Sequence, residues 1–117
     1  MAKRHELRTR YIVGWYEQDV GKLMETTADG FVLDDPVESA PVPKDGLAGY
    51  MQRWLERTGG ENNWRLTHEV REDKDGILTD WEWWEVLGTD MQGTAVVMTS
   101  DAGVQLERIT YFNRKRR

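Results

Sequence analysis

The chain has 117 residues, a formal net charge of −5 and no cysteine. Its length suits a single domain over residues 1–117 that buries a core without cross-links, and the lack of cysteine excludes disulfides and thiolate chemistry. The two histidines, His5 and His68, are too far apart in sequence to form a metal-ligand motif. We therefore expect no metal site and no haem.

Basic residues are concentrated at the two ends of the chain. Four of the sixteen Lys and Arg residues lie within residues 1–10 and four more within residues 114–117. No aromatic residue is interleaved with them, which argues against nucleic-acid binding. No apolar run approaches the roughly twenty residues of a membrane span, and residues 1–10 lack the apolar segment of a signal peptide. We expect a cytoplasmic protein with no nucleic-acid or membrane partner.

The first thirty-four residues predict two helices and a strand. Apolar residues recur every three or four positions across residues 6–18, as in an amphipathic helix. Asp19 is suited to cap the amides of a short second helix at residues 20–24. The apolar run at residues 31–34 then predicts a strand.

A loop and a third helix follow. Three prolines within residues 35–43 predict irregular structure. Asp45 is a plausible cap for a helix whose apolar stripe runs over residues 47–55, and Gly59 and Gly60 predict its end.

From residue 64 onward the hydrophobic period changes from near four to two, which predicts strands. They are expected at residues 64–72, 76–87, 93–100 and 104–112. Short turns between them predict antiparallel neighbours. The fold class is therefore α+β: a cone-shaped, curved antiparallel sheet with three helices in the N-terminal half, able to hold an apolar pocket between the first helix and the concave face.

The strand at residues 76–87 alternates between two faces. Trp81, Trp83 and Glu85 share one face, and the opposite face carries Asp80, Glu82 and Trp84. Two roles stay open for the tryptophans. In the first, most of them belong to the core or to a homodimer interface on the outer face of the sheet. In the second, Trp81 and Trp83 form an aromatic wall for a ring-shaped ligand. We also expect five large side chains to be mostly buried: Trp15, Leu23, Phe31, Trp54 and Phe112.

Two adjacent carboxylates, Asp34 and Asp35, follow the strand at residues 31–34 and precede Pro36. A surface turn is one explanation, because Asp and Pro are common where strands stop. A pocket base is the other, since a carboxylate near an apolar interior has a raised pKa and can accept protons near neutral pH.

The order of elements, together with Tyr11, Asp19, Asp35, residues 66–71 and a closing strand that ends in Phe112, resembles the NTF2-like superfamily. The resemblance is to its ketosteroid isomerase and SnoaL-like polyketide cyclase branch, over nearly the whole chain. It implies that Asp35 is the catalytic base and Tyr11 the donor to the enolate oxygen, with Asp34 facing away. The implied chemistry is proton abstraction next to a carbonyl group.

The chain differs from the isomerase pattern at several positions. The second acidic donor is absent, because its place falls near Ala95. Trp54 takes the place of a helix tyrosine, while Glu85 and Arg108 replace apolar pocket residues. Arg108 or Thr110 could supply the missing donor, and Arg108 and Glu85 are either an ion pair in the cone or unrelated surface charges.

Together with these differences, the resemblance implies an isomerase or cyclase that acts on a carbonyl-containing, largely apolar or aromatic small molecule. Asp35 and Tyr11 are the expected catalytic residues, and no cofactor is expected. The expected ligand-binding residues are Trp54, Trp81, Trp83, Glu85, Arg108 and Phe112. The alternative is a non-catalytic module that binds a small ligand or dimerises.

Overall fold

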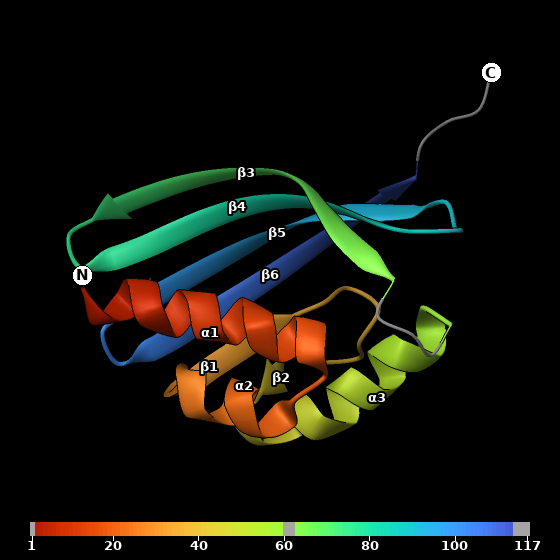
Figure 1. Ribbon diagram of the computed structural model, residues 1–117. Coiled ribbons are helices and arrows are strands. Elements are labelled where there is room, and N and C mark those ends of the chain that lie inside the picture. The colour runs from red at the N-terminus through yellow and green to blue at the C-terminus, as the bar shows by residue number, and fades with distance from the viewer. Residues whose placement is uncertain (1, 60–62, 114–117) are drawn as a thin grey trace.

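The structure is a computed structural model that describes residues 2–59 and 63–113 (Figure 1). Gly60, expected to end the third helix, and the basic residues 114–117 lie outside this range. The helices are α1 (Lys3–Glu17), α2 (Val20–Thr26), the 3-10 helix η1 (Lys44–Gly46) and α3 (Leu47–Arg57). The strands are β1 (Thr27–Asp34), β2 (Val42–Pro43), β3 (Trp64–Lys74), β4 (Ile77–Val86), β5 (Met91–Ser100) and β6 (Gly103–Asn113).

One six-stranded sheet runs in the order β2-β1-β6-β5-β4-β3. Strands β3 to β6 form antiparallel pairs, as their short connections predict. The expectation of a wholly antiparallel sheet is wrong, because β1 pairs with β6 in parallel. These two strands are joined through most of the chain, so no tight turn forces them to run in opposite directions.

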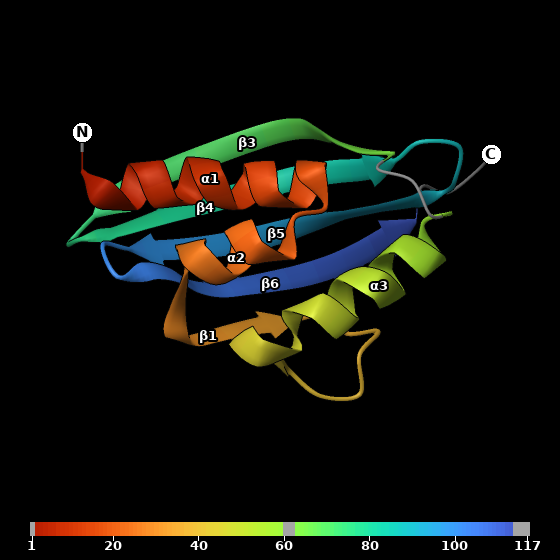
Figure 2. The same ribbon diagram turned by 60° about the horizontal axis from the view of Figure 1, so that its bottom comes forward.

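Helices α1, α2 and α3 all lie on one side of the curved sheet (Figures 1 and 2). The core fills the space between them and the concave face. It includes Leu23, Phe31 and Trp54, with 0%, 1% and 9% of their surface exposed, as expected. Trp15 is only part-buried, although it packs against this core. The α+β cone inferred from the sequence is therefore confirmed.

The N-terminal ends of α2 and α3 are capped differently. Asp19 caps α2 as predicted, since its side chain accepts a hydrogen bond from the amide of Lys22. Asp45 does not cap α3, because it lies inside η1 and the residue before α3 is Gly46. The loop between β1 and α3 is also less irregular than predicted, because Val42 and Pro43 pair with β1 as β2.

Strand β4 alternates as the sequence predicts, and the structure shows which face is inside. Asp80, Glu82 and Trp84 are buried under the helices, with 0%, 6% and 7% of their surface exposed. Trp81 and Trp83 therefore lie on the outer face, where Trp81 is 36% exposed. The homodimer through this outer face stays a prediction, and the outward aromatic residues are the neighbours of Trp84 rather than Trp84 itself.

The closing strand faces the opposite way from the one expected. In β6 the inward residues are Glu107, Ile109 and Tyr111, whereas Arg108 is exposed and Phe112 is 44% exposed. The predictions that Phe112 is buried and that Arg108 points inward are therefore wrong. A shift of one residue in a strand moves every side chain to the other face.

Among the described residues, no helix is long and apolar enough to cross a membrane.

Candidate functional site

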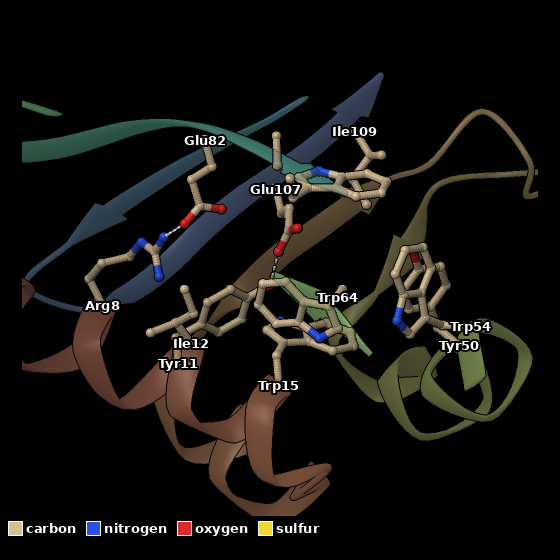
Figure 3. Close-up of a pocket in the computed structure, with 12 residues that line it drawn as sticks. Arg8, Tyr11, Ile12, Trp15, Tyr50, Trp54, Trp64, Glu82, Glu107 and Ile109 are labelled. Carbon is tan, nitrogen blue, oxygen red and sulfur yellow. Dashed lines mark hydrogen bonds and ion pairs between the residues drawn. The ribbon is translucent and has the colours of Figure 1, made fainter. Parts of the chain in front are cut away.

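A pocket lies between α1, α3 and the concave face of the sheet (Figure 3). Its cavity has a volume of about 60 Å³. Six aromatic residues and three charged residues dominate the lining. The full lining is Arg8, Tyr11, Ile12, Trp15, Tyr50, Trp54, Trp64, Glu82, Trp84, Ala95, Glu107 and Ile109. The pocket is thus aromatic, with a charged end.

Helix periodicity places one row of α1 side chains in this pocket. Arg8, Tyr11, Ile12 and Trp15 are spaced three or four residues apart, so they lie on the same face of the helix. Figure 3 shows these side chains rising from α1 towards the sheet. The row that makes the helix amphipathic therefore also lines the pocket.

The sheet supplies the carboxyl groups. Glu82 lies on β4 two residues before Trp84, and Glu107 lies on β6 two residues before Ile109. Alternate residues of a strand share a face, which brings both glutamates to the concave side. Between these strands, β5 contributes only the small Ala95, which is 2% exposed.

Tyr11 and Glu107 form the central polar contact of the pocket. The Tyr11 hydroxyl donates a hydrogen bond of 2.5 Å to Oε1 of Glu107 (Figure 3). Burial raises the pKa of the Glu107 carboxyl, and the hydrogen bond from Tyr11 opposes that rise. Burial and the neighbouring Glu107 hold the pKa of Tyr11 well above its usual value, so its phenol stays protonated and available as a donor.

A second buried polar cluster surrounds Arg8. Its Nε donates to Asp80 at 2.8 Å, and its Nη2 donates to Glu82. The other oxygen of Asp80, Oδ1, accepts a hydrogen bond from Nε of Arg71 at 2.6 Å. Burial raises the pKa of Glu82 to about 7, against the opposing charge of Arg8 and with Glu107 and Asp80 adding to the rise.

The raised pKa of Glu82 predicts a loss of stability as the pH rises. The folded protein holds a proton on Glu82 between the usual glutamate pKa and about pH 7, whereas the unfolded chain does not. The free energy of unfolding should therefore fall across this window, by up to about 3 kcal/mol from this group. Denaturant titrations at about pH 5 and about pH 8 should show a smaller fall in Glu82→Gln than in the wild type.

The matched control is Glu85→Gln on the opposite face of β4. Glu85 pairs with the exposed Arg65 at 2.8 Å, so its replacement leaves the buried Glu82 carboxyl and its surroundings in place. If the free energy of unfolding depended on pH equally in the wild type and in Glu82→Gln, the raised pKa of Glu82 would be contradicted.

Asp35 is buried, with 2% of its surface exposed, but its side chain is not part of the pocket lining. Its Oδ2 accepts hydrogen bonds from Tyr50 at 2.6 Å, Tyr111 at 2.7 Å and Arg57 at 3.0 Å. Its Oδ1 accepts from the amide of Val37 at 2.9 Å. This last contact is an Asx turn, so the carboxylate shapes the chain after β1 and also ties α3 to the sheet.

The structure brings together only part of the predicted site. Tyr11 and Trp54 line the pocket, while Trp81, Trp83 and Glu85 lie on the other face of β4. Phe112 and Arg108 lie on the outward side of β6 and are not in the lining. Arg108 donates to Asp34 at 3.2 Å and Glu85 pairs with Arg65, so Arg108 and Glu85 do not pair with each other.

Sequence analysis missed Arg8, Glu82 and Glu107 as pocket residues. A signal for Arg8 existed, since it falls one turn before Tyr11 on the same helical face. Glu82 shares a strand face with Trp84, but that face was not assigned to the interior. Glu107 was missed because the closing strand was placed one residue out of phase.

Among the described residues, no group of three or more histidine, aspartate or glutamate side chains could hold a metal ion.

No protein-family model matches the sequence, and no curated protein matches it either. Solved structures do match. A candidate ketosteroid isomerase from Kribbella flavida superposes with a TM-score of 0.66 at 13% identity, covering 99% of this chain and 82% of the other. An NTF2-like protein of unknown function from Cytophaga hutchinsonii superposes with a TM-score of 0.62 at 8% identity, covering 93% of this chain and 89% of the other. The chain has the NTF2-like fold.

A third structure with similar coverage is a candidate polyketide cyclase from Sinorhizobium meliloti. Its TM-score is 0.65 at 13% identity, covering 90% of this chain and 94% of the other. At such identities the likeness shows the NTF2-like fold and not the activity.

Proposed function

We propose that this NTF2-like protein is a small-molecule enzyme of the isomerase or cyclase type, which moves a proton next to a carbonyl group. The observation that carries the proposal is the Glu107 carboxyl, which lies in an aromatic pocket and accepts a hydrogen bond from Tyr11. In this mechanism Glu107 takes and returns the proton, and Tyr11 binds the carbonyl oxygen.

The environment of Glu107 suits a general base. An efficient base has a pKa near the working pH, and burial raises the pKa of this carboxyl from its ordinary acidic value. Before substrate binds, the hydrogen bond from Tyr11 fixes the position of this carboxyl. Because the hydroxyl carries one proton, a bound carbonyl oxygen replaces Glu107 as its acceptor. A carbonyl oxygen that accepts from Tyr11 would place its neighbouring carbon close to the Glu107 carboxylate.

Trp15 offers a second donor to the same oxygen. Its indole Nε1 is buried and has no hydrogen-bond partner among the described residues. The Trp15 ring packs edge-on against the Tyr11 ring, with their centroids 6.2 Å apart. Leaving a buried donor unpaired costs about 1–3 kcal/mol, so a ligand oxygen at this point would be stabilised.

The size of the cavity limits the substrate. Its volume of about 60 Å³ is well below the roughly 150 Å³ of an engineered apolar cavity that holds benzene. A single ring could therefore enter only if it projects from the mouth or if side chains move. A ligand of several fused rings would require a larger rearrangement.

The fold similarity gives general support. Structures with this fold include a candidate SnoaL-like isomerase, a candidate polyketide cyclase and a candidate ketosteroid isomerase. Asp35, the base implied by the family resemblance, is less suited to the role here. Both of its oxygens accept hydrogen bonds from protein groups, and the carboxyl does not line the pocket.

The proposal is tested by proton exchange. Wild-type protein would be incubated in D₂O with ring-bearing ketones and β-dicarbonyl compounds, and loss of the proton next to the carbonyl would be followed by NMR. We expect exchange faster than in buffer for at least one compound. Binding without any exchange would instead favour the alternative of a ligand-binding protein.

A further inference from the structure

The pocket region contains more carboxyl groups than cations. Three carboxyls belong to this region, the buried Asp80 and Glu82 and the part-buried Glu107, whereas Arg8 is the cation in the lining. The guanidinium of Arg8 already donates to Asp80 and Glu82. Asp80 has a second cation in Arg71.

Glu107 is the carboxyl with the weakest charge compensation. Among the described residues it forms no ion pair, and its hydrogen-bond donor is the neutral Tyr11 hydroxyl. Figure 3 shows its carboxyl pointing into the space between Tyr11 and the sheet, with Arg8 directed at Glu82 instead. A buried carboxylate without a cation is costly, so a positive charge brought by a ligand would be favourable.

The pocket walls also suit a cation. Four tryptophans and two tyrosines line the cavity, and the faces of such rings attract ammonium groups. An anionic ligand would be repelled by the ring faces and by the two carboxyl groups in the lining. The guanidinium of Arg8 already donates to Asp80 and Glu82, so it offers little compensation.

We infer that the ligand of this pocket carries a positively charged amine or quaternary ammonium group, held against Glu107 by an ion pair and by the surrounding aromatic rings. This inference rests on the proposed function, because it uses the same pocket and the same glutamate. The inference adds a role for the substrate. The positive charge of the substrate stabilises the ionised form of Glu107, which is the form that accepts a proton.

The experiment compares three probes that share a phenyl ring and a two-carbon tail: phenethylammonium, 2-phenylethanol and phenylacetate. Dissociation constants would be measured from tryptophan fluorescence, since Trp15, Trp54, Trp64 and Trp84 line the pocket. At about pH 8 we expect the ammonium probe to bind about tenfold more tightly than the alcohol, and phenylacetate to bind more weakly than the alcohol.

The preference should depend on pH and on Glu107. At about pH 5 the preference should shrink to roughly threefold or less, because burial raises the pKa of both pocket carboxyls, that of Glu82 to about 7, and so favours their uncharged forms as the pH falls. The other charged or titratable groups that face Glu107 and Glu82 are Arg8, Tyr11, Asp35, Tyr50, Glu69 and Asp80. Glu107→Gln should remove most of the preference, and the outer-face control Glu85→Gln should keep it.

Two results would overturn the inference and can be told apart. Equal affinities for the ammonium and the alcohol, or a preference for phenylacetate, would refute the cationic ligand and leave the pocket proposal standing. No binding of any probe at either pH would refute both. The comparison of probes on wild-type protein remains decisive even if Glu107→Gln folds poorly.

Discussion

Asp35→Asn is expected to lower the free energy of unfolding by about 3–5 kcal/mol, as removal of one partner from a buried ion pair does. The change removes the charge that pairs with Arg57 at 3.0 Å, and it disturbs two short hydrogen bonds from Tyr50 and Tyr111. These contacts join the turn after β1 to α3 and β6. Denaturant titration followed by fluorescence would measure the loss.

The matched control is Asp34→Asn. The Asp34 side chain is 45% exposed and its partner Arg108 is 61% exposed, so this pair should contribute at most about 1 kcal/mol. If the two substitutions had equal effects on stability, the structural role of Asp35 would be refuted.

Glu107→Gln is expected to lower the rate of proton exchange by about 10²–10⁴-fold, as loss of a general acid or base does. Glutamine keeps the size of the side chain and can still accept the hydrogen bond from Tyr11, but it cannot accept a proton. The exchange assay with the most responsive carbonyl compound would give the rate.

Asp35→Asn serves as the comparison, at a temperature where it is still folded. It should retain far more activity than Glu107→Gln, because Asp35 lies outside the pocket lining. The opposite order, with Glu107→Gln active and folded Asp35→Asn inactive, would restore Asp35 as the base and overturn our assignment.

The elements of the fold were predictable because local patterns determine them. The helical stripe that contains Tyr11 and Trp15, the Asp19 cap and the period-two strands each depend on residues close together in sequence. Parallel pairing of β1 with β6 depends on segments far apart, which no local pattern specifies.

The site was harder to predict, for two physical reasons. The charged residues Glu82 and Glu107 occupy interior positions that a hydrophobic pattern assigns to apolar side chains, so the pattern placed the neighbouring residues there. The contacts of Asp35 also depend on the whole fold, since Tyr111 is 76 residues away in sequence. The two explanations for Asp35 could be weighed only once these partners were known.

The most direct test of the central claim is a carboxyl ¹³C NMR titration of protein labelled at its aspartate and glutamate side chains, with and without a saturating ring-bearing ligand. We predict that Glu107 titrates above the ordinary glutamate pKa of about 4.3 and that its signal shifts when the ligand binds, while the Asp35 signal does not shift on binding. A Glu107 signal that titrates at the ordinary value and ignores the ligand, together with an Asp35 signal that responds to it, would contradict the account.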